Sequence, residues 1–232
     1  MLMIPLNLKA SLLLFTSMLV ASSPTWAGAE EDGGYWFNVH MQGDLPIQNF
    51  GWSMDTNPRY RNEGKHIDAL YLRPAVLYKL SSHASLWLGH DTIIGHPAGK
   101  SAYRETRWYE QFLYQFDPTS TVACSSRTRL EERRRGGFQN TGHRLRQMLK
   151  VSIPVKQHPK LSVVVYDELF INLNDTDWGV RHGMDQNRIF IGGKWKFNRH
   201  TYFEAGYLNQ FVNKAAVNIE NHVISATLGF RF

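Results

Sequence analysis

The sequence predicts an all-β protein, an antiparallel transmembrane β-barrel of ten strands, with twelve strands as the alternative. Three observations predict it: period-two segments between turn residues, a charged second face on many of those segments, and the final segment VISATLGFRF. In that segment Ile224, Ala226, Leu228 and Phe230 alternate with smaller or polar residues, and the chain ends on Phe232. Strict alternation is the pattern of a strand with two different faces.

Residues 1–29 have the features of a secretory signal peptide. Lys9 is the only charged residue before Glu30, and an apolar run, SLLLFTSMLVA, extends from Ser11 to Ala21. This run is too short to span a bilayer, and small residues at 27–29 suit cleavage after Ala29. The rest of the sequence has no run of about eighteen apolar residues, so we expect an exported protein without a transmembrane helix.

The composition of the sequence limits which molecules we expect this protein to bind. The single cysteine, Cys124, excludes an internal disulfide. Lys and Arg number 26 against 20 Asp and Glu, a formal charge of +6. For an exported chain this balance favours contact with outer-membrane lipid, lipopolysaccharide phosphates or other anions, and we expect no nucleic-acid partner.

Eleven segments read as strands. They are 35–43, 49–60, 67–80, 83–92, 104–116, 125–135, 143–155, 161–172, 186–197, 201–211 and 221–232. Bacterial barrels normally have an even number of strands, with both termini on the periplasmic side. We therefore expect the barrel to comprise residues 49–232, and residues 30–48 to form an N-terminal extension or an extra strand. The segments 61–66, 93–103, 136–142 and 173–185 are expected on the outer side.

The two faces of these segments favour a membrane barrel over a soluble sandwich. One face is apolar, as at Leu70, Leu72 and Val76, and the opposite face is often charged. Aromatic residues lie toward strand ends, as interfacial girdles require: Tyr78, Trp87, Trp108, Phe116, Trp195, Phe197, Phe203, Tyr207, Phe230 and Phe232. Three carboxylates fall on the apolar face and should lie near an interface or beside a bulge: Glu110, Glu132 and Asp167.

Two resemblances support this fold. The runs RETRWYEQF, SRTRLEERR, HRLRQMLKVSIP, YDELFINLN, DQNRIFIGG and EAGYLNQF resemble, in order and spacing, the family named domain of unknown function 2490. That resemblance implies a Gram-negative outer-membrane β-barrel without assigned chemistry. The C-terminal strand resembles the terminal signature of outer-membrane barrels. This second resemblance implies that the barrel assembly machinery reads the strand, with Phe230 and Phe232 as assembly signal and interface anchors.

The charged face predicts an ion-pair network in a narrow lumen. Its expected members are Glu105, Arg107, Arg127, Arg129, Glu131, Arg144, Arg146, Glu168, Arg188 and Glu204. Nine inward charges are basic and four acidic when Arg133, Lys150 and Lys194 are included. The network favours a structural role or the binding of small anionic solutes, with a selective anion channel as the alternative. The basic run 130–137 suits a solvated strand end, or contact with lipopolysaccharide.

Catalysis is not expected. His90, Asp91, His96 and Ser101 lie near a predicted outer strand end and could belong to an outer-rim lipid or peptide hydrolase, but their spacing matches no known motif. We therefore predict no catalytic residue, no metal and no cofactor. The acidic pair of LNDTDWG reads as a turn rather than a calcium loop. The substrate and the oligomeric state are left open.

Overall fold

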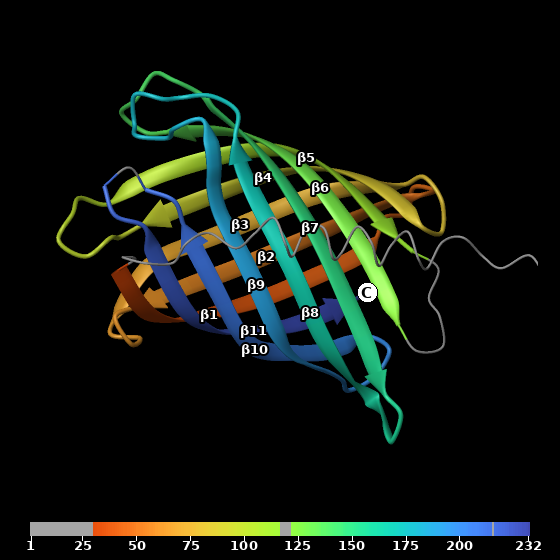
Figure 1. Ribbon diagram of the computed structural model, residues 1–232. Helices are drawn as coiled ribbons and strands as arrows, with labels where there is room; N and C mark the ends of the chain where they lie inside the picture. Colours follow the sequence, from red (N-terminus) through yellow and green to blue (C-terminus); the bar gives the residue numbers. More distant parts are fainter. Residues whose placement is uncertain (1–29, 117–121, 215) are drawn as a thin grey trace, which may run out of the picture.

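The computed structural model describes residues 30–116, 122–214 and 216–232, which form a closed barrel of eleven strands (Figure 1). The strands are β1 Glu30–Asp44, β2 Phe50–Arg61, β3 His66–Lys79, β4 Ala84–Gly95, β5 Tyr103–Gln115, β6 Ala123–Arg135, β7 Gly142–Val155, β8 His158–Asn172, β9 Gly183–Lys196, β10 Thr201–Val212 and β11 Ile219–Arg231. The predicted signal peptide, 1–29, lies outside the described residues. Within them, no helix is long and apolar enough to cross a membrane.

A parallel seam closes the barrel. Each strand pairs antiparallel with the next, and β1 pairs parallel with β11, from Glu30 opposite Ile219 to Gln42 opposite Arg231. The Phe232 N–H extends the seam by donating to the Gln42 carbonyl at 2.9 Å. All eleven predicted segments are strands, but the predicted counts of ten and twelve are wrong. The even-number rule assumed that the first and last strands meet antiparallel, whereas parallel pairing closes an odd number.

The barrel has two unlike rims. The long-loop rim carries residues 62–65, 96–102, 136–141, 173–182, 213–214 and 216–218 together with the start of β1. The short-turn rim carries 45–49, 80–83, 156–157 and 197–200, residues 116 and 122 beside the end of β5 and the start of β6, and the C-terminus. The four segments expected on the outer side therefore share one rim. The first residue of β1 and the last residue of β11 lie at opposite rims.

Two connections at the long-loop rim are tied together. The Asp177 carboxylate accepts the backbone N–H groups of Gln139 at 3.0 Å and Asn140 at 3.2 Å. Asp175 accepts the His182 N–H at 2.6 Å. Asp177 thus links two connections, whereas Asp175 accepts a hydrogen bond within its own connection. No group of three potential metal ligands occurs among the described residues.

The outward face is largely apolar. Exposed apolar residues of the strands include Leu70, Leu72, Val76, Leu86, Leu88, Trp108, Phe112, Ile153, Ile191, Trp195, Phe203 and Ile224. Glu110 and Glu132 are exposed on the same face. Alternation also places Asp167 outward, but it is buried and accepts a hydrogen bond from Asn187 Nδ2 at 2.6 Å. Trp87 is not part of a girdle, because it lines the interior.

The interior is apolar on one side and ionic on the other. Trp36, Val164, Phe190, Leu208 and Val223 form a buried cluster contributed by β1 and β8–β11. The ionic side chains come mainly from β5–β8. The expectation of a lumen filled by Arg and Glu therefore holds for only part of the wall.

Candidate functional site

Strand register brings the predicted charges together inside the barrel. β5, β6 and β7 are consecutive antiparallel neighbours, so their inward residues form adjacent rows. Arg107 lies opposite Arg133, and Glu131 lies opposite Arg144. Opposed arginines repel each other, so carboxylates must lie between them.

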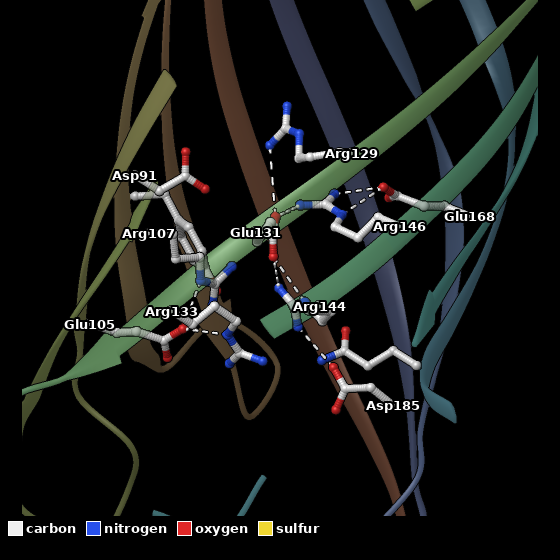
Figure 2. Close-up of polar contacts among 12 residues, drawn as sticks. Asp91, Glu105, Arg107, Arg129, Glu131, Arg133, Arg144, Arg146, Glu168 and Asp185 are labelled. Atoms are coloured by element: carbon white, nitrogen blue, oxygen red, sulfur yellow. Dashed lines mark hydrogen bonds and ion pairs between the residues drawn. The ribbon is translucent and has the colours of Figure 1, made fainter. Parts of the chain in front are cut away.

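Glu131 is the central carboxylate (Figure 2). Its side chain is completely buried, and Oε2 accepts Nε and Nη2 of Arg144 at 2.9 and 2.6 Å. Oε1 accepts Nη1 of Arg146 at 2.6 Å, and Arg129 Nη1 lies 3.9 Å from it. Arg144 also donates to Asp185 at 2.8 Å. A buried carboxylate is stable only when it is paired in this way.

Glu168 and Glu105 form two further centres. Glu168 Oε1 accepts Nε and Nη2 of Arg146 at 2.9 and 2.6 Å, and Nη2 of Arg127 at 2.5 Å. Glu105 Oε1 accepts Nε of Arg107 at 2.7 Å and of Arg133 at 2.8 Å. Because Arg146 bonds both Glu131 and Glu168, those two centres are linked.

All ten predicted lumen residues therefore point inward, although not all join one network. Arg188 Nη1 lies 3.9 Å from Glu168. Glu204 pairs separately, with Lys150 Nζ 2.9 Å from both of its oxygens. Phe230 and Phe232 lie apart from the lumen network, at the short-turn rim, where the Phe232 ring stacks on Trp52 with 5.9 Å between centroids.

An arginine cluster on β2 and β3 was not predicted from the sequence. Arg59 is buried, and its guanidinium lies 3.7 Å from the centre of the Trp36 ring and 4.0 Å from that of Tyr71. Arg59 Nε donates to Asn57 Oδ1 at 2.7 Å, and Nη1 donates to the Tyr71 hydroxyl at 3.1 Å. Arg73 lies 4.4 Å from the same Tyr71 ring. Alternation within 67–80 already placed Arg73 opposite the apolar face, but the contact of Arg59 with Trp36 depends on the register of β1 against β2, in which these two residues lie opposite each other.

Asp91, considered from the sequence only for the hydrolase alternative, lies in the interior beside Arg73. Its carboxylate is completely buried without a hydrogen bond, 3.5 Å from Arg73 Nε. The preceding residue, His90, faces the other way and packs edge-on against Trp108, with centroids 4.8 Å apart. The structure therefore does not bring His90 and Asp91 together.

Three cavities occupy the part of the lumen that side chains leave open. One of them, about 370 Å³, is lined by Glu105, Asp185 and four arginines. The long-loop cavity, about 350 Å³, opens toward the long-loop rim, and the short-turn cavity, about 390 Å³, lies toward the other rim. Only two described acidic residues, Asp32 and Asp68, line the long-loop cavity, and both are near Arg61. Ten basic residues line it: Arg59, Arg61, Arg73, Lys100, Arg107, Arg135, Arg144, Arg146, Arg188 and Lys214.

The three central carboxylates are absent from this lining. Glu105, Glu131 and Glu168 are at most 4 % exposed and do not line the long-loop cavity. Arginines thus neutralise carboxylates in the wall while some of them also present N–H groups to the cavity. Such a wall can bind anions through charge-assisted hydrogen bonds.

Fold and lumen together define a class: closed β-barrels with an apolar exterior and an arginine-rich interior. Comparison with known proteins agrees with the resemblance of the motifs. Residues 33–221 match the family described as protein of unknown function (DUF2490), and the chain belongs to this family. An uncharacterized protein of Methylorubrum extorquens is 33 % identical over 224 residues, covering 95 % of this chain and 97 % of that protein.

Proposed function

We propose that this chain is an outer-membrane barrel whose lumen binds small anionic solutes, with the buried ion pairs holding the barrel's shape. One observation carries the binding proposal: ten basic and two acidic described residues line the long-loop cavity. Positive charge in a partly dry cavity is costly unless an anion balances it. Arginine suits the task because its planar fork binds carboxylate and phosphate oxygens in pairs.

The outward face supports a membrane location. Leu70, Leu72 and Val76 of β3 are each exposed by more than 40 %, and similar residues lie on most other strands. A monomeric soluble protein rarely exposes so continuous an apolar surface. A closed barrel also leaves no unpaired strand edge in hydrocarbon. The predicted signal peptide and the C-terminal Phe232 are consistent with export and insertion.

Cell fractionation tests the location. We expect the protein in the outer-membrane fraction, extractable only by detergent, and migrating faster on electrophoresis before boiling than after. Recovery of a folded, detergent-free monomer from the periplasm would contradict the proposal. A membrane location without anion binding would leave only the structural role.

Calorimetry tests the binding. The folded barrel in uncharged detergent is titrated with inorganic phosphate, acetate and, for comparison, ammonium ions. We expect heat from at least one anion that diminishes as sodium chloride is raised, because salt screens charge. Failure of every anion to bind would refute solute binding.

A selective anion channel is the second candidate. The long-loop cavity and the short-turn cavity share lining residues, which favours a path along the lumen. Single-channel recording in planar bilayers should then give a small conductance with a reversal potential that favours anions. Absence of conductance, or selectivity for cations, would exclude this candidate while leaving solute binding intact.

A further inference from the structure

Five residues line both the long-loop cavity and the short-turn cavity, so they lie where these two cavities meet. They are one tryptophan and four arginines, and we call them the waist: Trp36, Arg59, Arg73, Arg146 and Arg188. No acidic residue of the described chain lines both cavities. The waist comes from β1, β2, β3, β7 and β9, so it reaches around much of the barrel.

Two waist arginines differ most in the number of carboxylates that they contact. Arg146 is fully committed to Glu131 and Glu168 through Nε, Nη1 and Nη2. Arg59 has no carboxylate within 4.0 Å among the described residues, and its Nη2 makes no hydrogen bond. Arg146 therefore belongs to the structural network, whereas Arg59 has donors available for a ligand.

The other two waist arginines are loosely paired. Arg73 Nε lies 3.5 Å from Asp91 but forms no hydrogen bond. Arg188 Nη1 lies 3.9 Å from Oε2 of Glu168, beyond hydrogen-bond distance, while its Nη2 donates to Gln186 Oε1 at 3.1 Å. Among the described residues, Arg73 and the Nη1 group of Arg188 therefore still have N–H donors without a hydrogen bond.

Aromatic rings hold these three arginines close to one another. The guanidinium groups of Arg59 and Arg188 lie 3.7 and 5.0 Å from the centre of the Trp36 ring, and those of Arg59 and Arg73 lie 4.0 and 4.4 Å from that of Tyr71. Cation–π contact offsets part of the repulsion among the buried cations. The remaining repulsion would be relieved by an anion with several oxygens.

We propose that the waist binds a phosphoryl group, as free phosphate or as a phosphate monoester, through Arg59, Arg73 and Arg188. This inference rests on the proposed anion binding and names its place and ligand. Three planar forks match a tetrahedral oxyanion, which presents oxygens in several directions. A phosphate monoester carries about −1.5 to −2 charges at neutral pH, more than a chloride or a monocarboxylate supplies.

Calorimetry on variants tests the waist. The variants are Arg59→Gln and Arg188→Gln, with Lys150→Gln as the matched control because Lys150 lines the short-turn cavity outside the waist. The probes are inorganic phosphate, glycerol 3-phosphate and acetate, each at constant ionic strength. Heat-modifiable migration verifies that every variant folds, and Arg188→Gln decides the question should Arg59→Gln not fold.

The expected result is phosphate affinity lowered about tenfold or more in both waist variants, because each loses charge-assisted hydrogen bonds. Lys150→Gln should change the affinity by no more than about twofold. Binding of glycerol 3-phosphate as tight as that of phosphate identifies monoesters as ligands, and binding of phosphate alone identifies the free ion.

Three results would overturn the inference. Unchanged phosphate binding in both waist variants would place the site elsewhere in the lumen and leave the proposed function standing. Acetate binding as tight as phosphate binding would refute the phosphoryl class. A wild-type barrel that binds no anion would end both the inference and the solute-binding proposal.

Discussion

Glu131 is the carboxylate on which the lumen network most depends, because two arginines share its oxygens. It is completely buried and bonds Arg144 through one oxygen and Arg146 through the other. Removing its charge leaves Arg144 with Asp185 and Arg146 with Glu168. Both arginines would then be less than fully balanced in a medium where water cannot replace the lost partner.

We therefore predict that Glu131→Gln lowers the free energy of unfolding by about 3 kcal/mol. The amide keeps the size of the side chain, so the loss reports charge rather than volume. Denaturant unfolding of the detergent-solubilised barrel, followed by tryptophan fluorescence, measures it. The control is Glu132→Gln, one residue along on the exposed face, which should change stability by no more than about 0.5 kcal/mol. Equal losses in the two variants would show that Glu131 has no special role.

Residue patterns predicted which charges face inward, but not which ones pair. Alternation within 126–134 is enough to place Arg129 and Glu131 on the same face. Pairing requires the register between strands, which put Glu131 opposite Arg144 and made Glu168 reachable from β6 and β7. The contact of Arg59 with Trp36 was also not predicted, because it depends on the pairing of β1 with β2.

At the level of the strand pair, β9 and β10 are in unusually close contact at two facing glycines. Gly206 lies opposite Gly192. A Cβ on Gly206 would lie 2.2 Å from the Ile191 carbonyl oxygen and 2.4 Å from Gly192 Cα. These are backbone atoms, so no side chain can move aside to make room. Glycines at such positions let a sheet bend sharply enough to close.

We predict that Gly206→Ala destabilises the barrel by about 2 kcal/mol or more, because the backbone must shift. Gly193→Ala is the matched control on the same pair of strands. Its Cβ would lie 3.7 Å from the nearest atom, Leu161 Cδ1, and its effect should stay within about 0.5 kcal/mol. Thermal unfolding monitored by circular dichroism compares the two. If Gly206→Ala is as stable as the control, the close approach does not exist in solution.

The positions of the strands were the most predictable part of the fold. All eleven predicted segments overlap observed strands, because alternation and turn residues are local signals. The segment 35–43 was assigned as an extension only because the even-number rule was applied to the count. In the structure it pairs with β2 and β11, and the pairing with β11 joins the two ends of the barrel sequence. No local pattern distinguishes parallel from antiparallel closure.

For the whole molecule, the parallel seam determines how the barrel closes, and a cross-link can test it. Phe37 of β1 lies opposite Ala226 of β11. Neighbouring strands are about 4.8 Å apart, within the range that a disulfide can bridge. In a Cys124→Ser background, Phe37→Cys with Ala226→Cys should therefore form a disulfide under mild oxidation, detected as faster migration without reductant.

In the control, Phe230→Cys replaces Ala226→Cys and shifts the second thiol about 13 Å along the strand, beyond the range of a disulfide. Cross-linking in the control alone, or in neither pair, would rule out this register.

Closure with eleven strands also places the start of β1 and the end of β11 at opposite rims. Because β1 and β11 run parallel, β1 begins at the long-loop rim while β11 ends at the short-turn rim. If the longer loops face outward, as is usual in outer-membrane barrels, then the start of β1 lies on the cell surface. An even-stranded barrel would place it in the periplasm instead.

We predict that an epitope inserted at residue 30 is labelled by antibody on intact cells, whereas the same epitope in the turn 45–49 is labelled only after the outer membrane is permeabilised. Each tagged protein must first show the heat-modifiable migration of the folded barrel. Shielding of both epitopes in intact cells would mean that β1 begins on the periplasmic side and that the barrel closes with an even number of strands.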